Sequence, residues 1–173
     1  MQDILEKAKK IKLVIFDVDG VLTDGRIIIG DDGQEYKAFH TRDGHGMKLL
    51  QLTGVNIAII SGRTSKTVEH RMKGLGITHV FQGKQVKLPV FEQLIADLAL
   101  TPEQCAYVGD DWVDIAIMNR VGLAIAVQDA DNVVKKHAHW ITPSNGGHGA
   151  AREVCELIME GQGNLQDQIE RHF

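Results

Sequence analysis

The chain has 173 residues, of which 43% are hydrophobic, and its formal net charge at pH 7 is −4. This size and composition fit one globular domain, residues 1–173, and argue against a second domain of ordinary size. The acidic balance argues against nucleic-acid binding, and the lack of an apolar run of about 20 residues argues against a membrane protein. We expect a cytoplasmic protein, because residues 1–10 lack the apolar core of a secretory signal. Cys105 and Cys155 lie far apart in apolar contexts, so we expect buried free thiols.

Short apolar runs alternate with amphipathic segments of helical length along the chain. The runs indicate strands and the segments indicate helices, which is the βαβ pattern of a parallel sheet. The predicted fold class is therefore α/β, a Rossmann-like doubly wound parallel sheet. The predicted strands are residues 13–16, 55–60, 79–81, 105–108 and 123–127, and the predicted helices are residues 47–53, 64–75, 86–98, 111–120 and 131–136.

Two short strand-like runs, residues 26–29 and 35–39, interrupt this alternation directly after the first strand. The turn residues Gly-Asp-Asp-Gly at 30–33 join them into a predicted β-hairpin, residues 26–39. This insertion is too small to be a cap domain. A site above the first strand would therefore take a bulky substrate or be closed by a neighbouring molecule. The polar segment 161–173 is expected to be a mobile tail.

Polar groups that can carry chemistry follow four of the predicted strands. In chain order they are Asp17 and Asp19, then Ser61-Gly62-Arg63, then Lys84 or Lys87, then Gly109-Asp110-Asp111 with Asp114. The carboxyl ends of parallel strands line the crevice in which open α/β sheets bind ligands. Singly, each group is explained as a turn, a solvated lysine or a pair of acids at a helix start. Together, at four strand ends, they favour a catalytic site.

This set resembles the haloacid dehalogenase superfamily of phosphatases, whose motifs are Asp-x-Asp, a Ser or Thr, a Lys and an acidic pair. The resemblance implies that Asp17 is a nucleophile that forms an aspartyl-phosphate. Asp19 would protonate the leaving alkoxide and then activate water. Ser61 would donate a hydrogen bond to the phosphoryl group, and a lysine would neutralise its charge. We choose Lys87 over Lys84, because Lys87 lies near the start of the next helix in the stretch FQGKQVKL.

The same resemblance implies a Mg²⁺ cofactor, since a carboxylate that approaches a phosphate needs a hard cation with oxygen ligands. The metal ligands would be the side chains of Asp17 and Asp110 and the backbone carbonyl of Asp19. Asp111 and Asp114 would steer the metal's waters without ligating the metal.

Longer stretches are similar to the family of 3-deoxy-D-manno-octulosonate 8-phosphate phosphatases, and this similarity covers nearly the whole chain. The stretches are DVDGVLTDG, HTRDGHG, SGRTS, GDDWVD and GGHGAAREV. The similarity implies a phosphomonoester hydrolase of lipopolysaccharide precursor biosynthesis that lacks a cap domain and forms a homotetramer. The hairpin would then pack into a barrel shared with neighbouring chains. In the alternative, its strands extend the sheet of a monomer.

A sugar acid phosphate carries a carboxylate as well as a phosphate, so we expect guanidinium groups to recognise it. Arg42 and Arg63 are the main candidates, and Arg71 is a weaker one because it lies on a predicted helix. Residues 40–44 are expected to form a loop that leaves the hairpin and reaches the ligand with its backbone. The expected substrate-binding residues are Asp19, His40, Thr41, Arg42, Asp43, Gly44, Arg63, Arg71 and Lys87.

Three other functions stay open at this point. A related enzyme would hydrolyse a nine-carbon sugar acid 9-phosphate, since relatives without a cap share the same motifs. A phosphoacceptor signalling domain would also use an aspartate and a lysine on a parallel sheet, but here Asp19 is available to hydrolyse the intermediate. A non-catalytic partner subunit would not need the motifs to be intact.

Overall fold

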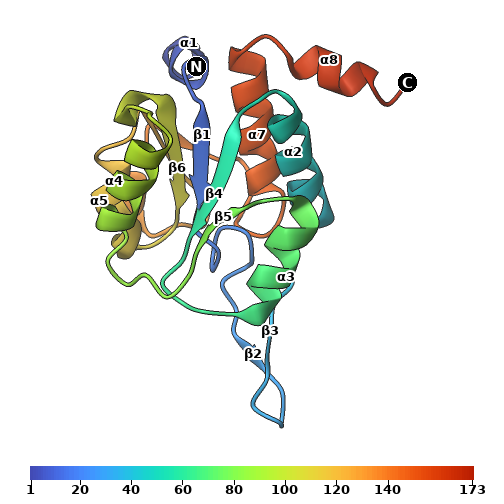
Figure 1. Cartoon of the computed structure of the whole chain (residues 1–173), viewed down its shortest axis with the longest axis vertical. Coiled ribbons are helices and arrows are strands. Elements are labelled where there is room, and N and C mark those ends of the chain that lie inside the picture. The colour runs from blue at the N-terminus through green and yellow to red at the C-terminus, as the bar shows by residue number, and fades with distance from the viewer.

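The computed structural model describes all residues, 1–173, and its centre is a six-stranded parallel sheet (Figure 1). In spatial order the strands are β5 (His79–Phe81), β4 (Asn56–Ile60), β1 (Leu13–Phe16), β6 (Cys105–Gly109), β7 (Leu123–Ala126) and β8 (Trp140–Ile141). The chain starts in the middle at β1, builds outward to β4 and β5, and then crosses back to β6. The direction of winding reverses between β1 and β6, which opens a crevice at their carboxyl ends. The predicted α/β class is confirmed.

Helices cover both faces of this sheet. On one face lie α2 (Thr41–Leu52), α3 (Lys66–Leu75) and α7 (Ala150–Gly161), and on the other lie α4 (Leu88–Asp97) and α5 (Ile115–Met118) (Figure 1). The shorter elements are α1 (Gln2–Ala8), α6 (Asn132–Lys135), α8 (Leu165–Glu170) and the 3₁₀ turns η1 (Pro102–Gln104) and η2 (Trp112–Asp114). No helix of the chain has both the length and the apolar character that crossing a bilayer would need.

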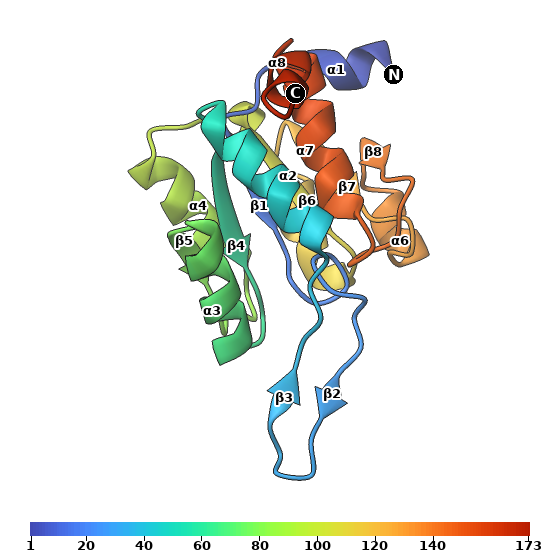
Figure 2. The ribbon, with the colours of Figure 1, turned by 90° about the vertical axis from the view of Figure 1, so that its right-hand side faces the viewer.

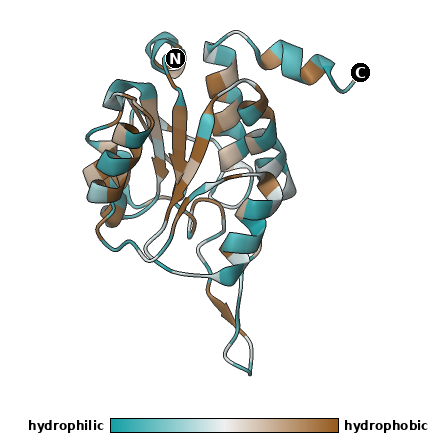
Figure 3. Cartoon of the chain, in the orientation of Figure 1, coloured by the Kyte–Doolittle hydropathy of each residue, from teal (hydrophilic) through white to brown (hydrophobic).

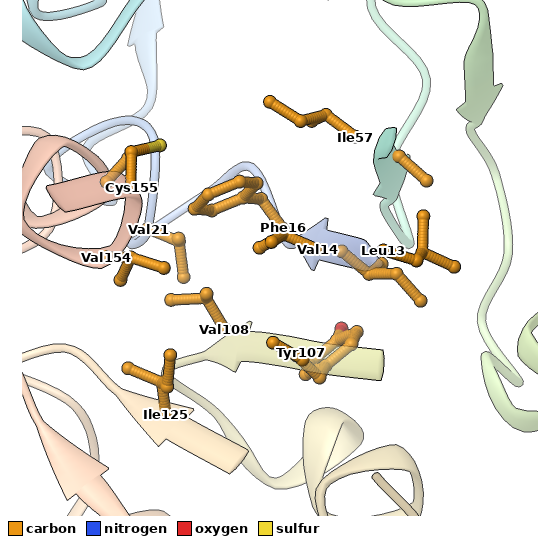
Figure 4. Packing of buried hydrophobic residues seen from close by; sticks show 14 of the residues in the cluster. Leu13, Val14, Phe16, Val21, Ile57, Tyr107, Val108, Ile125, Val154 and Cys155 are labelled. Atoms are coloured by element: carbon orange, nitrogen blue, oxygen red, sulfur yellow. The ribbon is translucent and has the colours of Figure 1, made fainter. Parts of the chain in front are cut away.

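The core lies where the strands meet the helices on each face, and the strands are the most hydrophobic part of the chain (Figure 3). All four residues of β1 are fully buried because both of its faces are covered. On one face Phe16 packs toward Val154 and Cys155 of α7 (Figure 4). Fully burying an aliphatic or aromatic side chain stabilises the fold by about 1.5–3 kcal/mol. Both cysteines are buried and unpaired, as the sequence predicted.

The hairpin projects away from this body (Figure 2). Its strands, β2 (Ile28–Ile29) and β3 (Glu35–Tyr36), pair only with each other, so the alternative in which they extend the central sheet is wrong. Apolar side chains on the hairpin face solvent, and Ile29 is 66% exposed. A two-stranded ribbon of this kind is marginally stable in water unless something covers it.

The five predicted strands agree with the structure to within one residue at each end. Strand β8 was not predicted, because a two-residue edge strand has no periodicity to detect. The predicted helix 111–120 is instead η2 followed by the four-residue α5. The expected tail contains α8, and Gln168 on this helix is buried. The mobility of the tail stays a prediction.

Candidate active site

A polar cleft of about 310 Å³ opens at the carboxyl ends of the strands. It brings together eight of the residues that the sequence singled out, which are Asp17, Asp19, Ser61, Gly62, Arg63, Lys87, Asp110 and Asp111. Asp17 follows β1 and Asp110 follows β6, so these two carboxylates face each other across the point where the winding reverses. Ser61 follows β4 and is buried, with its backbone N–H bonded to the carbonyl of Phe81.

Lys87 is buried at the base of the cleft, with only 1% of its side chain exposed. Its Nζ lies 2.8 Å from Asp17 Oδ2 and 2.7 Å from Asp114 Oδ1. These two carboxylates compensate the loss of hydration and hold the pKa of Lys87 above its usual value, although burial alone would lower it. Lys84 is exposed and does not line the cleft, so the geometry favours Lys87 as the lysine of the site.

Asp114 is fully buried, and both of its oxygens have protein partners. Oδ1 accepts hydrogen bonds from Lys87 Nζ and, at 2.6 Å, from the hydroxyl of Tyr107. Oδ2 accepts the backbone N–H groups of Asp110 at 3.0 Å and Asp111 at 3.2 Å. A side chain at Gly109 would collide with Asp114, so this close approach requires glycine. Asp114 therefore orients both Lys87 and the Asp110 backbone, which fits support of the site better than metal ligation.

Tyr107 is a component of the site that the sequence reading missed, because it occupies an ordinary core position of strand β6. Its ring is fully buried among core residues (Figure 4). Its hydroxyl lies 3.2 Å from Lys87 Nζ. Burial, followed by the charge of Asp114, raises the pKa of Tyr107 well above its usual value. The hydroxyl therefore remains a hydrogen-bond donor to Asp114. Lys87, Tyr107 and Asp114 form the core polar cluster beneath the cleft.

Negative charge is concentrated around Asp17 and Asp110. One oxygen from each of Asp17, Asp110 and Asp114 falls within a group of atoms no more than 4.8 Å apart. Burial, together with the charge of Asp17, raises the pKa of Asp110 to about 8, and burial with the charge of Asp114 raises the pKa of Asp17 to about 6. Asp110 Oδ1 is buried without a hydrogen-bond partner. A hard divalent cation with oxygen ligands would relieve this repulsion, so the residues present fit Mg²⁺.

Asp19 belongs to a second charged group at the mouth of the cleft. Its Oδ1 pairs with Lys37 of the hairpin, and its Oδ2 lies 3.7 Å from Arg63 Nε. Glu35 of β3 closes the ring, because Oε1 lies 2.8 Å from Lys37 Nζ and Oε2 pairs with the Arg63 guanidinium. We call Asp19, Lys37, Glu35 and Arg63 the hairpin ring. Lys37 and Glu35 were not predicted, since a lysine and a glutamate on a short strand resemble ordinary surface residues.

Residues 41–44 form the first turn of α2, so the predicted loop at 40–44 is wrong. The helix begins six residues before the predicted start, because Gly44 and Gly46 hid the helical pattern. These glycines serve close packing: a side chain at Gly44 would displace the Arg71 guanidinium, and one at Gly46 would press on the side chain and Cα of Arg152. Asp43 is buried, and its Oδ1 accepts the backbone N–H of Arg152 at 2.9 Å.

The predicted binding residues of this region lie outside the cleft of their own chain. Thr41 and Arg42 are exposed on α2. His40, Asp43, Gly44 and Arg71 line a separate, small hollow between α2 and α3. The Arg71 guanidinium stacks on Phe39, 5.8 Å from the ring centroid, and donates to the carbonyl of His40 at 3.5 Å. Their role in substrate binding stays a prediction.

The loop before α7 packs against the segment that follows Asp17. Gly147 donates its N–H to the carbonyl of Val21 at 2.9 Å, and a side chain at Gly146 would overlap the carbonyl of Gly20. Asp129 accepts the N–H of Gly146 at 2.8 Å. The two glycines are therefore required by close backbone contact with residues 20–24.

Comparison with known proteins gives consistent matches over this fold. Residues 76–154 match the model of the haloacid dehalogenase-like hydrolases. The 3-deoxy-D-manno-octulosonate 8-phosphate phosphatase KdsC of Escherichia coli K12 is 47% identical over 165 residues, which are 95% of this chain and 88% of that protein.

Two solved structures superimpose on nearly the whole chain. A probable YrbI family phosphatase from Pseudomonas syringae pv. phaseolicola has a TM-score of 0.98 and 52% identity, covering 99% of this chain and 98% of that one. The 3-deoxy-D-manno-octulosonate 8-phosphate phosphatase of Moraxella catarrhalis, in complex with a magnesium ion, a phosphate ion and KDO, has a TM-score of 0.98 and 42% identity. That match covers 100% of this chain and 99% of the other.

Proposed function

Because this chain belongs to the 3-deoxy-D-manno-octulosonate 8-phosphate phosphatase family of haloacid dehalogenase-like hydrolases, we propose that it hydrolyses this sugar acid phosphate with Mg²⁺ as cofactor. The products are 3-deoxy-D-manno-octulosonate and inorganic phosphate, and the step belongs to lipopolysaccharide precursor biosynthesis. The observation that carries the proposal is the meeting of Asp17, Lys87 and Asp110 in one cleft at the reversal point of the sheet.

In the first half-reaction, a carboxylate oxygen of Asp17 attacks phosphorus and the bond to the sugar oxygen breaks. Asp19 gives a proton to the departing sugar alkoxide, which leaves as the alcohol. Lys87 and Ser61 stabilise the phosphoryl oxygens, on which negative charge is spread in the transition state. Lys87 is well suited to this role, because Asp114 and Tyr107 hold its ammonium beside Asp17.

In the second half-reaction, Asp19 takes a proton from water, and the water oxygen attacks phosphorus. The bond between phosphorus and Asp17 breaks, phosphate leaves, and the Asp17 carboxylate is restored. Bound Mg²⁺ supplies positive charge that lets the Asp17 carboxylate and the anionic phosphate approach each other. The side chains of Asp17 and Asp110 would hold this ion. The family resemblance adds the backbone carbonyl of Asp19.

The oligomeric state is part of the proposal. The hairpin exposes about half or more of each of four apolar side chains, which are Ile27, Ile28, Ile29 and Tyr36. Burying them against hairpins of other copies would stabilise an element that is marginal alone. We propose a homotetramer in which neighbouring chains close the cleft, which has no cap domain above it. Sedimentation at micromolar concentration measures this state, and a monomer would contradict it. The cytoplasmic location likewise stays a prediction.

Steady-state phosphate release across a panel of phosphosugars tests the proposed activity. The panel contains the eight-carbon 8-phosphate, a nine-carbon sugar acid 9-phosphate, glucose 6-phosphate and p-nitrophenyl phosphate, each with Mg²⁺ and with a chelator. We expect the highest kcat/KM for the eight-carbon substrate and loss of activity with the chelator. A preference for the nine-carbon substrate would reassign the substrate, and a lasting phosphoprotein without continuous release would indicate a phosphoacceptor domain.

A further inference from the structure

One charged side chain at the base of the hairpin, that of Lys37, points back toward the body of the chain. Lys37 directly follows β3, and only 2% of its side chain is exposed. Its neighbour Tyr36 is 50% exposed, as expected when successive residues of an extended segment point to opposite sides. A buried ammonium is costly unless it is paired. The hairpin therefore has a contact with its own chain that is separate from its exposed apolar surface.

Two carboxylates compensate the charge of Lys37, and one of them is Asp19. Asp19 Oδ1 pairs with Lys37 Nζ, and Glu35 Oε1 lies 2.8 Å from the same nitrogen. Pairing with Asp19 and Glu35 outweighs burial and raises the pKa of Lys37. Glu35 thus anchors Lys37 independently of Asp19, so Lys37 can hold the Asp19 carboxylate without being held by it alone.

The other oxygen of Asp19 has a weaker partner. Arg63 Nε lies 3.7 Å from Asp19 Oδ2, and the Arg63 side chain is 47% exposed, whereas that of Lys37 is 2% exposed. The Arg63 guanidinium also pairs with Glu35, and it is more open to solvent than the ammonium of Lys37. The direction of the Asp19 carboxylate is set mainly from the side of the hairpin.

We infer that Lys37 is a positioning residue: anchored by Glu35, it holds the Asp19 carboxylate toward the oxygen of the leaving group. This inference rests on the proposed function, in which Asp19 transfers the proton to that oxygen. It gives the hairpin a part in catalysis within its own chain. Lys37 itself does not touch the reacting atoms, so its effect must pass through Asp19.

A double-mutant cycle tests this dependence on the full-length chain with Mg²⁺ and the eight-carbon substrate. The four proteins are the wild type, Asp19→Asn, Lys37→Met and the double variant. We expect Lys37→Met to lower kcat roughly 10-fold with KM changed less than about twofold, since general acid–base catalysis contributes about 100- to 10,000-fold in all. In the Asp19→Asn background the same change should have almost no further effect. An equal loss in both backgrounds would overturn the inference.

The leaving group supplies a second readout that a purely structural role would not move. The phenolate released from p-nitrophenyl phosphate needs little protonation, so Lys37→Met should lower its release much less than release of the sugar. Lys37→Arg should recover part of the lost kcat, because a cation returns beside Asp19. A uniform loss with both substrates and no recovery by arginine would also count against the inference.

Control variants separate this inference from loss of fold and from the proposed function. Lys48→Met removes an exposed lysine of α2 and should leave kcat and KM unchanged. If Lys37→Met does not fold, Glu35→Gln loosens the anchor of Lys37 and should give a smaller loss with the same dependence on the leaving group. An inactive wild type would refute the proposed function. An active wild type with an equally active Lys37→Met variant would refute only the role of Lys37.

Discussion

Two lysines of this chain each lie between two carboxylates, but on different scaffolds. Lys87 lies between Asp17 and Asp114, whose side chains are 9% and 0% exposed, at the base of the cleft. Lys37 lies between Asp19 and Glu35, whose side chains are both 24% exposed, at the base of the projecting hairpin. Only 1% of the Lys87 side chain and 2% of the Lys37 side chain are exposed, but Lys37 as a whole residue is half-buried and its partner carboxylates are more open to water.

This difference in the partners changes what each lysine does. Around Lys87 little water screens the charges, so each member of the core polar cluster depends strongly on the others. Around Lys37, water and salt weaken the pairing, and the hairpin ring orients side chains at small energetic cost. The comparison therefore predicts large effects for changes beside Lys87 and modest effects for changes beside Lys37.

The largest effect is expected when Lys87 loses its reactive partner. Asp17→Asn should lower phosphate release by roughly 1,000-fold or more, as expected for removal of a nucleophile. The fold should persist, because burial and the charge of Asp114 already make the Asp17 carboxylate unfavourable and raise its pKa to about 6. Asp31→Asn, at the exposed hairpin turn, is the matched control. Turnover within tenfold of the wild type would remove Asp17 as the nucleophile.

Removing each lysine in turn measures the difference in stability directly. Lys87→Met leaves two buried carboxylates uncompensated and should cost about 3–5 kcal/mol of unfolding free energy. Lys37→Met should cost about 1 kcal/mol or less, as for an ion pair that water reaches. Urea titrations at pH 7.5 give both values, with exposed Lys84→Met as the reference. Equal costs for Lys87 and Lys37 would break the proposed contrast.

Tyr107→Phe removes a hydroxyl from the core polar cluster and keeps the ring. Asp114 Oδ1 then loses a donor at 2.6 Å, which should cost about 1–2 kcal/mol of stability and lower kcat several-fold. Thermal unfolding and steady-state rates are the measurements. Tyr36→Phe on the exposed hairpin should change stability by less than about 0.5 kcal/mol. If Tyr107→Phe changed neither stability nor kcat, the Tyr107 hydroxyl would have no part in orienting Asp114.

The smallest effect concerns Glu35 and depends on pH. Hydrogen bonding to Lys37 lowers the pKa of Glu35 from its ordinary value of 4.5. A carboxyl with a lowered folded pKa contributes stability that is present above the unfolded pKa and is lost as pH falls through the folded pKa. The difference between wild type and Glu35→Gln should be about 1 kcal/mol or less at pH 7 and smaller at pH 3, since it is lost as pH falls below 4.5 and through the lowered folded pKa. Urea titrations at both pH values measure this difference in unfolding free energy. A difference that increases at acid pH would contradict the prediction.

The sequence predicted best where a residue's role depends on its own strand. Asp17 and Asp110 were found because each ends an apolar run, and parallel strands bring such ends to one edge. Lys87 was chosen over Lys84 from its position in the stretch FQGKQVKL, which resembles the family. By contrast, the role of Tyr107 depends on the hydrogen bond that its hydroxyl donates to Asp114. An aromatic residue in a core strand gives no indication of such a bond in the sequence.

The errors concern residues whose role depends on contacts with residues that are distant in the sequence. Gly44 was taken as a loop residue and Gly46 was left outside the predicted helix, but both lie in α2, where they let the helix pack closely against Arg71 and Arg152. Lys37 was taken as part of a strand, but Asp19 enters its surroundings from the loop after β1. Long-range contacts of this kind leave no local periodicity, so a single sequence could not reveal them.

The position of β1 in the middle of the sheet also decides when the site can form during synthesis. Strand β1 is the first strand made, yet its neighbours are residues 56–59 and 105–108. At about 5–20 residues per second, a ribosome needs roughly 5 to 20 seconds to extend the chain from β1 to β6. The glycine loop that packs on the Gly20 carbonyl emerges later still. Until β6 is made, the growing chain therefore carries the wholly apolar strand β1 with an open edge, where a chaperone or another nascent chain can bind.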